Sequence, residues 1–388
     1  MENEFYFRIE RFGSCCNDSG NIILRNRKET SDFLDENGLW NDKYKKEVKE
    51  LWKDKEGKIS LMNLRLPCAL ELEYTYKCNL RCKYCYAYSS PFRNETIPFD
   101  NFKRLIKSID RSDVFDVYVL GGEPCILPNY LEYLLNNLHN KFIIIVSNLT
   151  LINKKICEYV RNSHNHVEFC VTIDGAEKDI HNSTRGLFDK VCRGLDFLRE
   201  YSIPIRVNSC VTPYNFDKLE DILKFLIPYN IVTIKFSPVG TNHLPREIVN
   251  ELDISKNYKG LMEHLFELQT RYRHRINIDM AFDSEMNLNF DRSNEMNTVI
   301  YGPCTAGVIK AGIDINGEIV PCVSTSSKIK IPFKGSFEDA FETLKLEILK
   351  SGRKIIEQNN MLRVQNCCQI IGYGKEKPIC EIKTIKSL

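Results

Sequence analysis

The sequence lacks a strong charge of either sign and any long hydrophobic run. Its 54 basic and 52 acidic residues leave a formal net charge of +2. We therefore expect no nucleic-acid partner, because proteins that bind phosphate backbones usually carry a strongly basic face. The longest purely aliphatic stretch lies within residues 142–146, far short of the roughly 18 to 20 apolar residues that a membrane span needs. We expect no membrane partner either.

The sequence also lacks the marks of an exported protein. Its first residues, Met1 to Glu4, are acidic and show no basic region, apolar core or cleavage site. We therefore expect a cytoplasmic protein, in a compartment where thiols stay reduced and disulfides are rare. The 16 cysteines then favour metal ligation or redox chemistry.

Cysteines concentrate in two parts of the chain. Cys78, Cys82 and Cys85 share one short segment. Five more gather towards the end of the sequence, at Cys304, Cys322, Cys367, Cys368 and Cys380. Most others stand singly in apolar segments, where a small buried hydrophobe is the simplest interpretation. The two groups are the candidate metal ligands.

Residues 1–64 differ in pattern from the rest of the chain. Two strand-like stretches, 5–12 and 21–25, flank a turn-rich connection next to Cys15 and Cys16, which we also take as turn residues. Two helical stretches come next, at 29–34 and 41–52. We expect a small α/β unit. It is either a winged-helix-like unit that recognises a peptide or a lid that packs on the main domain.

Residues 65–290 alternate strand and helix patterns. The expected strands are 69–75, 114–120, 142–147, 167–173, 205–211 and 232–237, and the expected helices are 99–109, 129–138, 154–162, 187–200, 216–226 and 257–272. This alternation predicts a parallel sheet with crossover helices. The stretch has no dinucleotide-binding glycine fingerprint, so we predict a partial (β/α)6 barrel of the TIM type. A doubly wound open sheet is the alternative.

Residues 291–388 form the third expected unit. Residues 311–320 have the pattern of a β-hairpin that turns at Asn316 and Gly317. Cys304 and Cys322 bracket this hairpin, which predicts a cysteine-rich C-terminal module.

The loop Cys78-Asn-Leu-Arg-Cys82-Lys-Tyr-Cys85 comes directly after the first expected strand of the barrel. Three thiolates at this spacing can cover one face of a [4Fe–4S] cube and leave its fourth iron without a protein ligand. The carboxyl end of a barrel strand is also where barrel enzymes place their chemistry. The alternative, structural zinc, usually needs four ligands, and no fourth Cys or His stands near this loop in the sequence.

At this loop the sequence resembles the radical S-adenosylmethionine superfamily. The family signature is three cysteines at this spacing with an aromatic residue before the third, here Tyr84. The resemblance implies that the open iron binds the amino and carboxylate groups of S-adenosylmethionine (SAM). One-electron reduction would then split SAM into methionine and a 5′-deoxyadenosyl radical. The cofactor supplies the difficult chemistry, while the protein supplies orientation and exclusion of solvent.

Two further segments resemble parts of this family's SAM site. Gly121, Gly122 and Glu123 belong to a Gly-Gly-Glu-Pro segment after the second strand, and its glycines let the backbone approach the methionine amino group. Ser147 and Asn148 end the third strand, where the family binds ribose or carboxylate. The resemblance implies cofactor-binding roles for all five residues.

A third segment lies after the fourth strand. Asp174, His181 and Arg185 resemble the Asp-Gly…His…Arg segment of the family's peptide-modifying branch. The resemblance implies that Arg185 pairs with the cofactor carboxylate, and that Asn208 on the fifth strand also contacts the cofactor. Purely structural roles for Arg185 and Asn208 are the alternative.

The C-terminal cysteines resemble the opening of a SPASM or twitch module, which carries auxiliary [4Fe–4S] clusters. Cys304, Gly317 and Cys322 have its spacing. The later cysteines are too few for two fully ligated clusters. The resemblance therefore implies one auxiliary cluster, held by Cys304, Cys322, Cys380 and either Cys367 or Cys368. The alternatives are two incompletely ligated clusters, or structural thiols.

The overall layout resembles maturases of ribosomally made peptides. The resemblance implies a precursor peptide whose leader is bound by residues 1–64, and an external one-electron donor such as flavodoxin or ferredoxin. The adenosyl radical would abstract hydrogen from the peptide and lead to a thioether or carbon–carbon cross-link. The alternatives are oxidation of Cys or Ser as in anaerobic sulfatase maturases, dehydrogenation of a small sugar or aminocyclitol as in twitch enzymes, and an iron–sulfur regulatory protein without turnover.

Overall fold

The computed structural model describes most of the expected barrel and part of the C-terminal unit. The described residues are 15–16, 22–23, 66–67, 69–112, 114, 116–240, 244–272, 275–276, 278–281, 299–300, 306–307, 310–323, 329–333 and 336–359. The predicted helices at 29–34 and 41–52 lie outside them, as do Cys304, Cys367, Cys368 and Cys380. No helix in the described ranges combines the length and the hydropathy needed to cross a bilayer.

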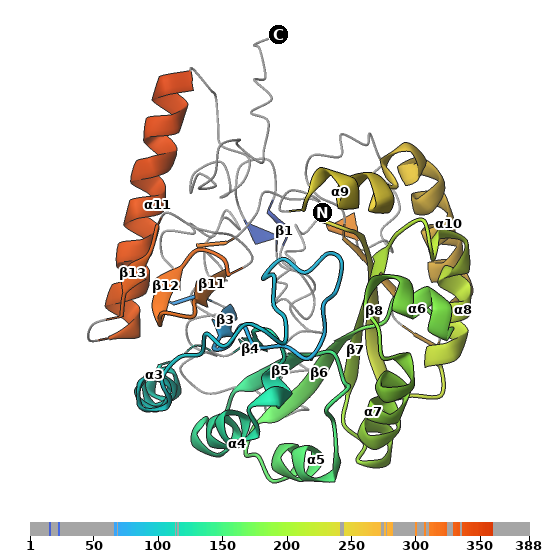
Figure 1. Ribbon diagram of the computed structural model, residues 1–388. Helices are drawn as coiled ribbons and strands as arrows, with labels where there is room; N and C mark the ends of the chain where they lie inside the picture. Colours follow the sequence, from blue (N-terminus) through green and yellow to red (C-terminus); the bar gives the residue numbers. More distant parts are fainter. Residues whose placement is uncertain are drawn as a thin grey trace, which may run out of the picture.

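A curved parallel sheet lies at the centre of the molecule (Figure 1). The six predicted barrel strands are β3 (Ala69–Glu73), β4 (Asp116–Leu120), β5 (Phe142–Ser147), β6 (His166–Thr172), β7 (Ile205–Val211) and β8 (Ile231–Pro238). They are parallel, and their order in the sheet follows their order in the chain. A doubly wound sheet reverses its order at a switch point. The observed order is instead that of a partial barrel.

The sheet continues on both sides of these strands. Beyond β8 lie β9 (Ile278–Ala281) and β10 (Val299–Ile300), and on the other side β11 (Lys310–Ile313) pairs in parallel with β3. β12 (Glu318–Val320) and β13 (Ile331–Pro332) come next as antiparallel neighbours. β11 and β12 confirm the predicted hairpin, with Gly317 at a φ of 75° in its turn. The sequence did not predict that this hairpin joins the barrel sheet.

The helices agree with the predicted pattern in the barrel and add others. They are α3 (Phe99–Arg111), α4 (Pro128–Asn137), α5 (Lys154–Arg161), α6 (Lys178–Thr184), α7 (Phe188–Glu200), α8 (Leu219–Leu226), α9 (Arg246–Leu252), α10 (Tyr258–Tyr272) and α11 (Phe337–Asn359), with short 3-10 turns η2 (Pro124–Ile126), η3 (Phe216–Lys218) and η4 (Ser255–Asn257). The prediction of one helix over 216–226 was wrong in its first turn, which is η3. Helices α6, α9 and α11 were not predicted.

Helices α3, α4, α5, α7 and α8 line the outer side of the curved sheet (Figure 1). On β3, Leu70 and Leu72 belong to the core that these helices cover, and the ring of Tyr74 lies 5.2 Å from that of Phe102 in α3. Because side chains alternate between the faces of a strand, Glu71 and Glu73 point to the concave side of the sheet. The concave side of the sheet therefore carries the carboxyl groups of Glu71 and Glu73.

The N-terminal strand pair contains two residues that we had expected in a turn. The structure describes β1 (Cys15–Cys16) paired antiparallel with β2 (Ile22–Ile23). The predicted strand 21–25 contains β2, but Cys15 and Cys16 form a strand and not the turn we had expected. The predicted strand 5–12 lies outside the described residues.

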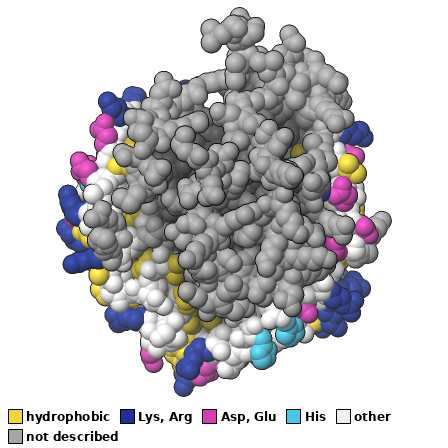
Figure 2. Space-filling model, turned by 180° about the vertical axis from the view of Figure 1, so that it is seen from behind, with side chains coloured by type: hydrophobic (Ala, Val, Ile, Leu, Met, Phe, Trp, Pro, Cys, Tyr) yellow, Lys and Arg dark blue, Asp and Glu magenta, His cyan; other side chains and the backbone are white. Residues whose placement is uncertain are grey.

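The described surface carries charges of both signs. In Figure 2, Lys and Arg side chains alternate with Asp and Glu around the edge of the described part of this face. Charged side chains of opposite sign also pair within helices, such as Lys103 with Asp100 at 2.9 Å and Lys154 with Glu158 at 3.7 Å. Such exposed pairs contribute little to stability, and they agree with the balanced composition.

Candidate active site

The segment after β3 folds back on itself and carries the first three cysteines. The backbone N–H of Tyr76 donates to the Glu95 carbonyl at 2.9 Å, and that of Cys78 donates to the Ser90 carbonyl at 3.2 Å. Cys78 is 7% exposed, whereas Cys82 and Cys85 are half-buried, and all three are free thiols. The loop therefore presents three thiols at the carboxyl end of β3, as predicted.

These thiols lie close enough to influence one another's ionisation. Burial raises the pKa of Cys78 to about 12, and the charges of Glu123, Cys82 and Cys85 add to the rise. Burial also raises the pKa of Cys82, against the opposing effect of the nearby Arg185. Thiols of this kind stay protonated at neutral pH until a metal cation takes the place of the proton. A bound iron centre would supply that cation.

Three free thiols on one loop are the kind of donor set that an iron–sulfur cube uses. In a [4Fe–4S] cube each thiolate binds a different iron, so the protein ligands stand apart around one face. Within the part of the chain that the structure describes, no group of three or more His, Cys, Asp or Glu side chains converges on one metal position. The chemistry of Cys78, Cys82 and Cys85 matches the group that the sequence resemblance implies, and their ligation of a cluster stays a prediction.

The Gly-Gly-Glu-Pro segment lies directly against the chain that leads into Cys78. A Cβ atom on Gly121 would stand 2.5 Å from the Thr75 carbonyl oxygen, and one on Gly122 would stand 2.2 Å from the Lys77 carbonyl oxygen. Gly121 also has a φ of 144°, which side chains rarely allow. The Gly122 N–H donates to the Thr75 carbonyl at 2.6 Å. The close approach that requires these glycines is thus to the thiol segment itself.

Glu123 connects this segment to the end of β5. Its buried carboxylate accepts from the backbone N–H of Cys125 at 3.0 Å, the hydroxyl of Ser147 at 2.8 Å and the backbone N–H of Asn148 at 2.7 Å. Burial raises the pKa of Glu123, and these donors oppose the rise. Asn148 in turn lies with Nδ2 3.8 Å from the Cys78 sulfur. The structure therefore brings Glu123, Ser147 and Asn148 together with the thiol loop, as predicted.

Tyr84 connects the same loop to the segment after β6. Its hydroxyl donates to the buried carboxylate of Asp174 and accepts from Nη1 of Arg185 at 3.0 Å. The Thr184 hydroxyl also donates to Asp174, at 2.8 Å, and the Lys83 N–H donates to the Thr184 carbonyl at 2.9 Å. Burial alone would lower the pKa of Arg185, but Tyr84, Cys82 and Asp174 raise it well above its usual value. A permanent cation is therefore held beside Cys82.

Two predicted residues have different surroundings. Asn208 lies on β7 and its Nδ2 donates to the Cys170 sulfur at 3.3 Å; no described hydrogen bond joins it to the thiol loop. Its contact with a cofactor stays a prediction. His181 is fully buried against Phe188, and burial, aided by Arg185, lowers its pKa to about 3. His181 is therefore neutral, and its Nδ1 accepts from the backbone N–H of Asp174 at 3.4 Å.

Sequence reasoning missed three side chains that support the site. Asn79 donates from Nδ2 to Thr150 Oγ1 at 2.7 Å and accepts from Asn148 at 3.0 Å. Asn215 donates from Nδ2 to the Asp174 carbonyl at 2.8 Å. Asn79 could have been found from its place inside the cysteine loop. Thr150 and Asn215 lie on irregular segments whose positions no local pattern predicts.

Cys322 is the one predicted auxiliary ligand among the described residues. It lies just after β12 and is 8% exposed. The charge of Cys322 contributes to the raised pKa of Tyr86, the residue after Cys85. Cys322 therefore lies on the side of the barrel where the thiol loop begins, while the auxiliary cluster itself stays a prediction.

The parallel barrel and the three-thiol loop after its first strand lie in a part of the chain that matches a known family. Residues 72–226 match the family model described as the Radical SAM superfamily. These residues hold the thiol loop, the Gly-Gly-Glu-Pro segment and the Asp174–Arg185 segment. The chain therefore contains a radical SAM domain.

Several known proteins are similar to this chain. The antilisterial bacteriocin subtilosin biosynthesis protein AlbA of Bacillus subtilis (strain 168) is 23% identical over 284 residues, covering 72% of this chain and 59% of AlbA. The mycofactocin maturase MftC of Mycolicibacterium smegmatis is 26% identical over 170 residues, 43% of each chain. The chain thus matches less than two thirds of the length of either relative. The crystal structure of Streptococcus suis SuiB has a TM-score of 0.60 and 18% identity, covering 98% of this chain and 100% of SuiB. This last likeness concerns the fold.

Proposed function

We propose that this protein is a radical SAM enzyme that modifies a ribosomally made peptide. The observation that carries the proposal is the loop of three free thiols at the carboxyl end of β3. Cys78, Cys82 and Cys85 would hold a [4Fe–4S] cluster with one open iron. When bound, this cluster and SAM supply a 5′-deoxyadenosyl radical that can abstract hydrogen from an unactivated carbon.

The chain's own residues position and shield this chemistry. Gly121 and Gly122 lie against the backbone that leads into Cys78, and Glu123 anchors their loop to Ser147 and Asn148. These loops fix the thiols relative to the ends of β4 and β5. A preorganised arrangement of this kind lowers the cost of reaching a reactive geometry.

Arg185 is the proposed partner of the SAM carboxylate. It is held by the Tyr84 hydroxyl at 3.0 Å and lies beside Cys82. A guanidinium matches the geometry of a carboxylate and forms strong charge-assisted hydrogen bonds. Asp174 would orient Arg185 through Tyr84, and Asn208 would contact the cofactor from β7.

The peptide substrate is supported by the relatives. AlbA is a bacteriocin biosynthesis protein, MftC is a maturase, and SuiB has been crystallised with its precursor peptide SuiA, in a structure with a TM-score of 0.54 to this chain. Residues 1–64 would recognise the leader, residues 65–290 would form the radical domain and residues 291–388 the auxiliary-cluster domain. One auxiliary cluster would be held by Cys304, Cys322, Cys380 and either Cys367 or Cys368. A cytoplasmic location and a flavodoxin or ferredoxin donor complete the proposal.

The test uses protein reconstituted without air with iron and sulfide, reduced with dithionite and supplied with SAM. We expect the wild type to form 5′-deoxyadenosine and to change the mass of a short peptide encoded beside its gene. Cys82→Ala should lose both activities, because two thiolates cannot anchor the cube. Cys192→Ala is the matched control, since Cys192 is also a half-buried free thiol but lies on α7. Equal nucleoside formation by Cys82→Ala and wild type would contradict the proposal.

A further inference from the structure

Three carboxylates meet where the C-terminal hairpin joins the barrel. Glu71 and Glu73 point to the concave side of β3, and Asp314 comes directly after β11, the strand that pairs with β3. Two of these three carboxylates form an ion pair with a lysine. Lys310 Nζ lies 2.8 Å from Glu71 Oε1, and Lys330 Nζ lies 2.6 Å from Asp314 Oδ2.

Glu73 is the exception. Its residue is 1% exposed, and among the described residues its carboxylate makes no ion pair. The Tyr86 hydroxyl donates to Glu73 Oε1 at 3.4 Å. Arg93, whose charge interacts with that of Glu73, stacks on the ring of Tyr76 at 4.3 Å and pairs with Glu95 at 2.8 Å. A buried carboxylate with phenol donors and no cation strongly favours its protonated form.

The ionisation of Glu73 agrees with this geometry. Burial raises the pKa of Glu73 to about 8, against the hydrogen bonds of Tyr76 and Tyr86, while the charges of Glu71 and Asp314 add to the rise. A group with this pKa can both hold and release a proton near neutral pH, which is what general acid–base chemistry requires.

The position of Glu73 links the two cysteine groups. Glu73 is the last residue of β3, the strand that leads into the thiol loop. Its partner Tyr86 directly follows Cys85. The charges of both Cys85 and Cys322 contribute to the raised pKa of Tyr86. The Glu73–Tyr86 pair therefore lies near both the thiol loop and the proposed auxiliary ligand Cys322.

We propose that Glu73 accepts the proton that the peptide loses when the cross-link forms. This assignment rests on the proposed function. After hydrogen abstraction, a substrate carbon radical that bonds to a thiol sulfur or to a second carbon must shed one proton and one electron. The S–H or C–H bond of the attacked group would break and its proton would pass to Glu73, while a bound iron–sulfur centre would serve as the oxidant that accepts the electron.

The other buried carboxylates of the site are less suited to this role. Glu123 already accepts hydrogen bonds from two backbone N–H groups and the Ser147 hydroxyl. Asp174 accepts from Tyr84, from Thr184 and from the backbone N–H of Cys210, and it lies near Arg185. Protonation of either would cost these donors their acceptor. The hydrogen bonds that the structure describes to Glu73 come instead from the phenols of Tyr76 and Tyr86.

The activity test compares wild type, Glu73→Gln and Glu71→Gln, reconstituted and supplied with SAM and the peptide encoded beside the gene. We expect Glu73→Gln to keep forming 5′-deoxyadenosine but to yield about 100-fold less cross-linked peptide per nucleoside. The wild-type yield should rise with pH up to about 8, and the variant should lose this dependence. Glu73→Asp should restore part of the yield. Glu71→Gln, on the same face of the same strand, should keep the yield at high pH. Its pH dependence should move to lower pH, because the charge of Glu71 contributes to the raised pKa of Glu73.

An infrared titration tests the residue without any peptide. The difference between reconstituted wild type and Glu73→Gln should contain a protonated carboxyl band that disappears as the pH rises through about 8. A Glu73 already ionised well below that pH, or an unchanged yield and pH profile in Glu73→Gln, overturns the assignment. Wild type that forms 5′-deoxyadenosine yet modifies no peptide would instead contradict the proposed function, and the infrared band would still decide whether Glu73 holds a proton.

Discussion

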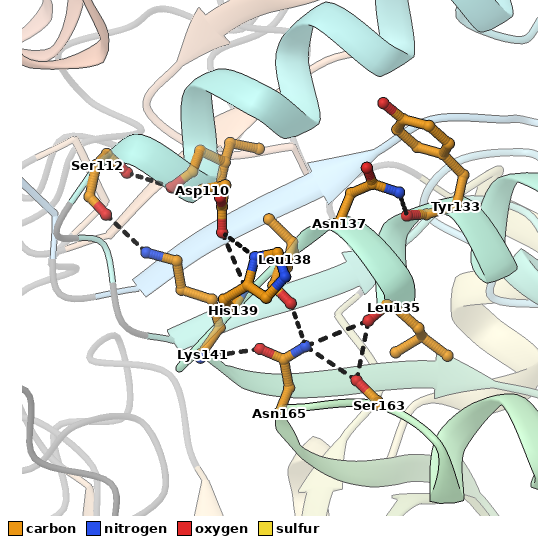
Figure 3. A network of polar contacts seen from close by, with 11 residues as sticks. Asp110, Ser112, Tyr133, Leu135, Asn137, Leu138, His139, Lys141, Ser163 and Asn165 are labelled. Atoms are coloured by element: carbon orange, nitrogen blue, oxygen red, sulfur yellow. Dashed lines mark hydrogen bonds and ion pairs between the residues drawn. The ribbon is translucent and has the colours of Figure 1, made fainter.

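The two ends of the barrel use buried polar side chains in different ways. At the amino ends of the strands, the Asn165 side chain accepts from the backbone N–H of Lys141 at 3.0 Å and donates to the Leu138 carbonyl at 2.6 Å (Figure 3). Lys141 Nζ donates to the Ser112 carbonyl at 2.6 Å. His139 joins Asp110 at 3.1 Å in the same network. Most of these hydrogen bonds join a side chain to the backbone of a neighbouring loop.

At the carboxyl ends, side chains bond both to backbone groups and to other side chains, close to free thiols. Glu123 holds Ser147, and Tyr84 holds both Asp174 and Arg185. Both ends also contain a group whose pKa burial brings to about 8, Lys141 at one end and Glu73 at the other. A shifted pKa therefore does not mark function by itself. Glu73 differs from Lys141 because its hydrogen-bond partner Tyr86 lies near the free thiols Cys85 and Cys322.

The largest effect should come from Gly122→Ala at the carboxyl end. The new Cβ would stand 2.2 Å from the Lys77 carbonyl oxygen, so the thiol segment must shift. We expect 5′-deoxyadenosine formation to fall about 100-fold, since a displacement near 1 Å can cost that much. Gly240→Ala is the control, because a Cβ there meets nothing within 4 Å. Equal activity of both variants would show that this loop does not set the geometry.

Lys141→Met tests the amino end. Burial lowers the pKa of Lys141 from 10.5 to about 8. Between these values the unfolded chain binds more protons than the folded one, so wild-type stability should rise with pH by about 3 kcal/mol across this window. The variant should lose this rise and keep its 5′-deoxyadenosine formation. Urea unfolding of both proteins between about pH 8 and pH 10.5 measures the change in stability. Reduced SAM cleavage in Lys141→Met would show that the amino end of the barrel also takes part in the chemistry.

Tyr84→Phe should have the smallest effect. It removes the hydroxyl that accepts from Arg185 at 3.0 Å but keeps the ring. We expect the KM for SAM to rise about tenfold, corresponding to the roughly 1.5 kcal/mol typical of a hydrogen bond to a charged group, while iron content stays unchanged. A lower kcat with an unchanged KM would place Tyr84 in the chemistry and not in cofactor positioning.

The sequence predicted the barrel because its strands and helices are locally periodic. β5 and β7 begin and end where we expected, and the thiol loop was visible from its spacing alone. What the sequence could not predict depends on contacts between distant residues. The pairing of β11 with β3 brings Lys310 to Glu71 across 239 positions, and no local pattern encodes such a register.

The candidate site shows the same limit. Glu123, Ser147 and Asn148 were found from motifs, but their mutual hydrogen bonds were not. Glu73 was hidden inside a strand, where an alternating pattern predicts only which face a residue takes. Lys310 and Lys330 pair with Glu71 and Asp314, and only the folded chain reveals that Glu73 shares the region without an ion pair among the described residues.

The central claim is that Cys78, Cys82 and Cys85 hold a cube with an open iron that binds SAM. Electron paramagnetic resonance of the reduced, reconstituted protein tests this most directly. We predict that SAM changes the signal of the wild-type cluster, and that Cys82→Ala loses the SAM-sensitive component. A protein that retains only zinc, or a cluster signal that SAM leaves unchanged, would contradict the account.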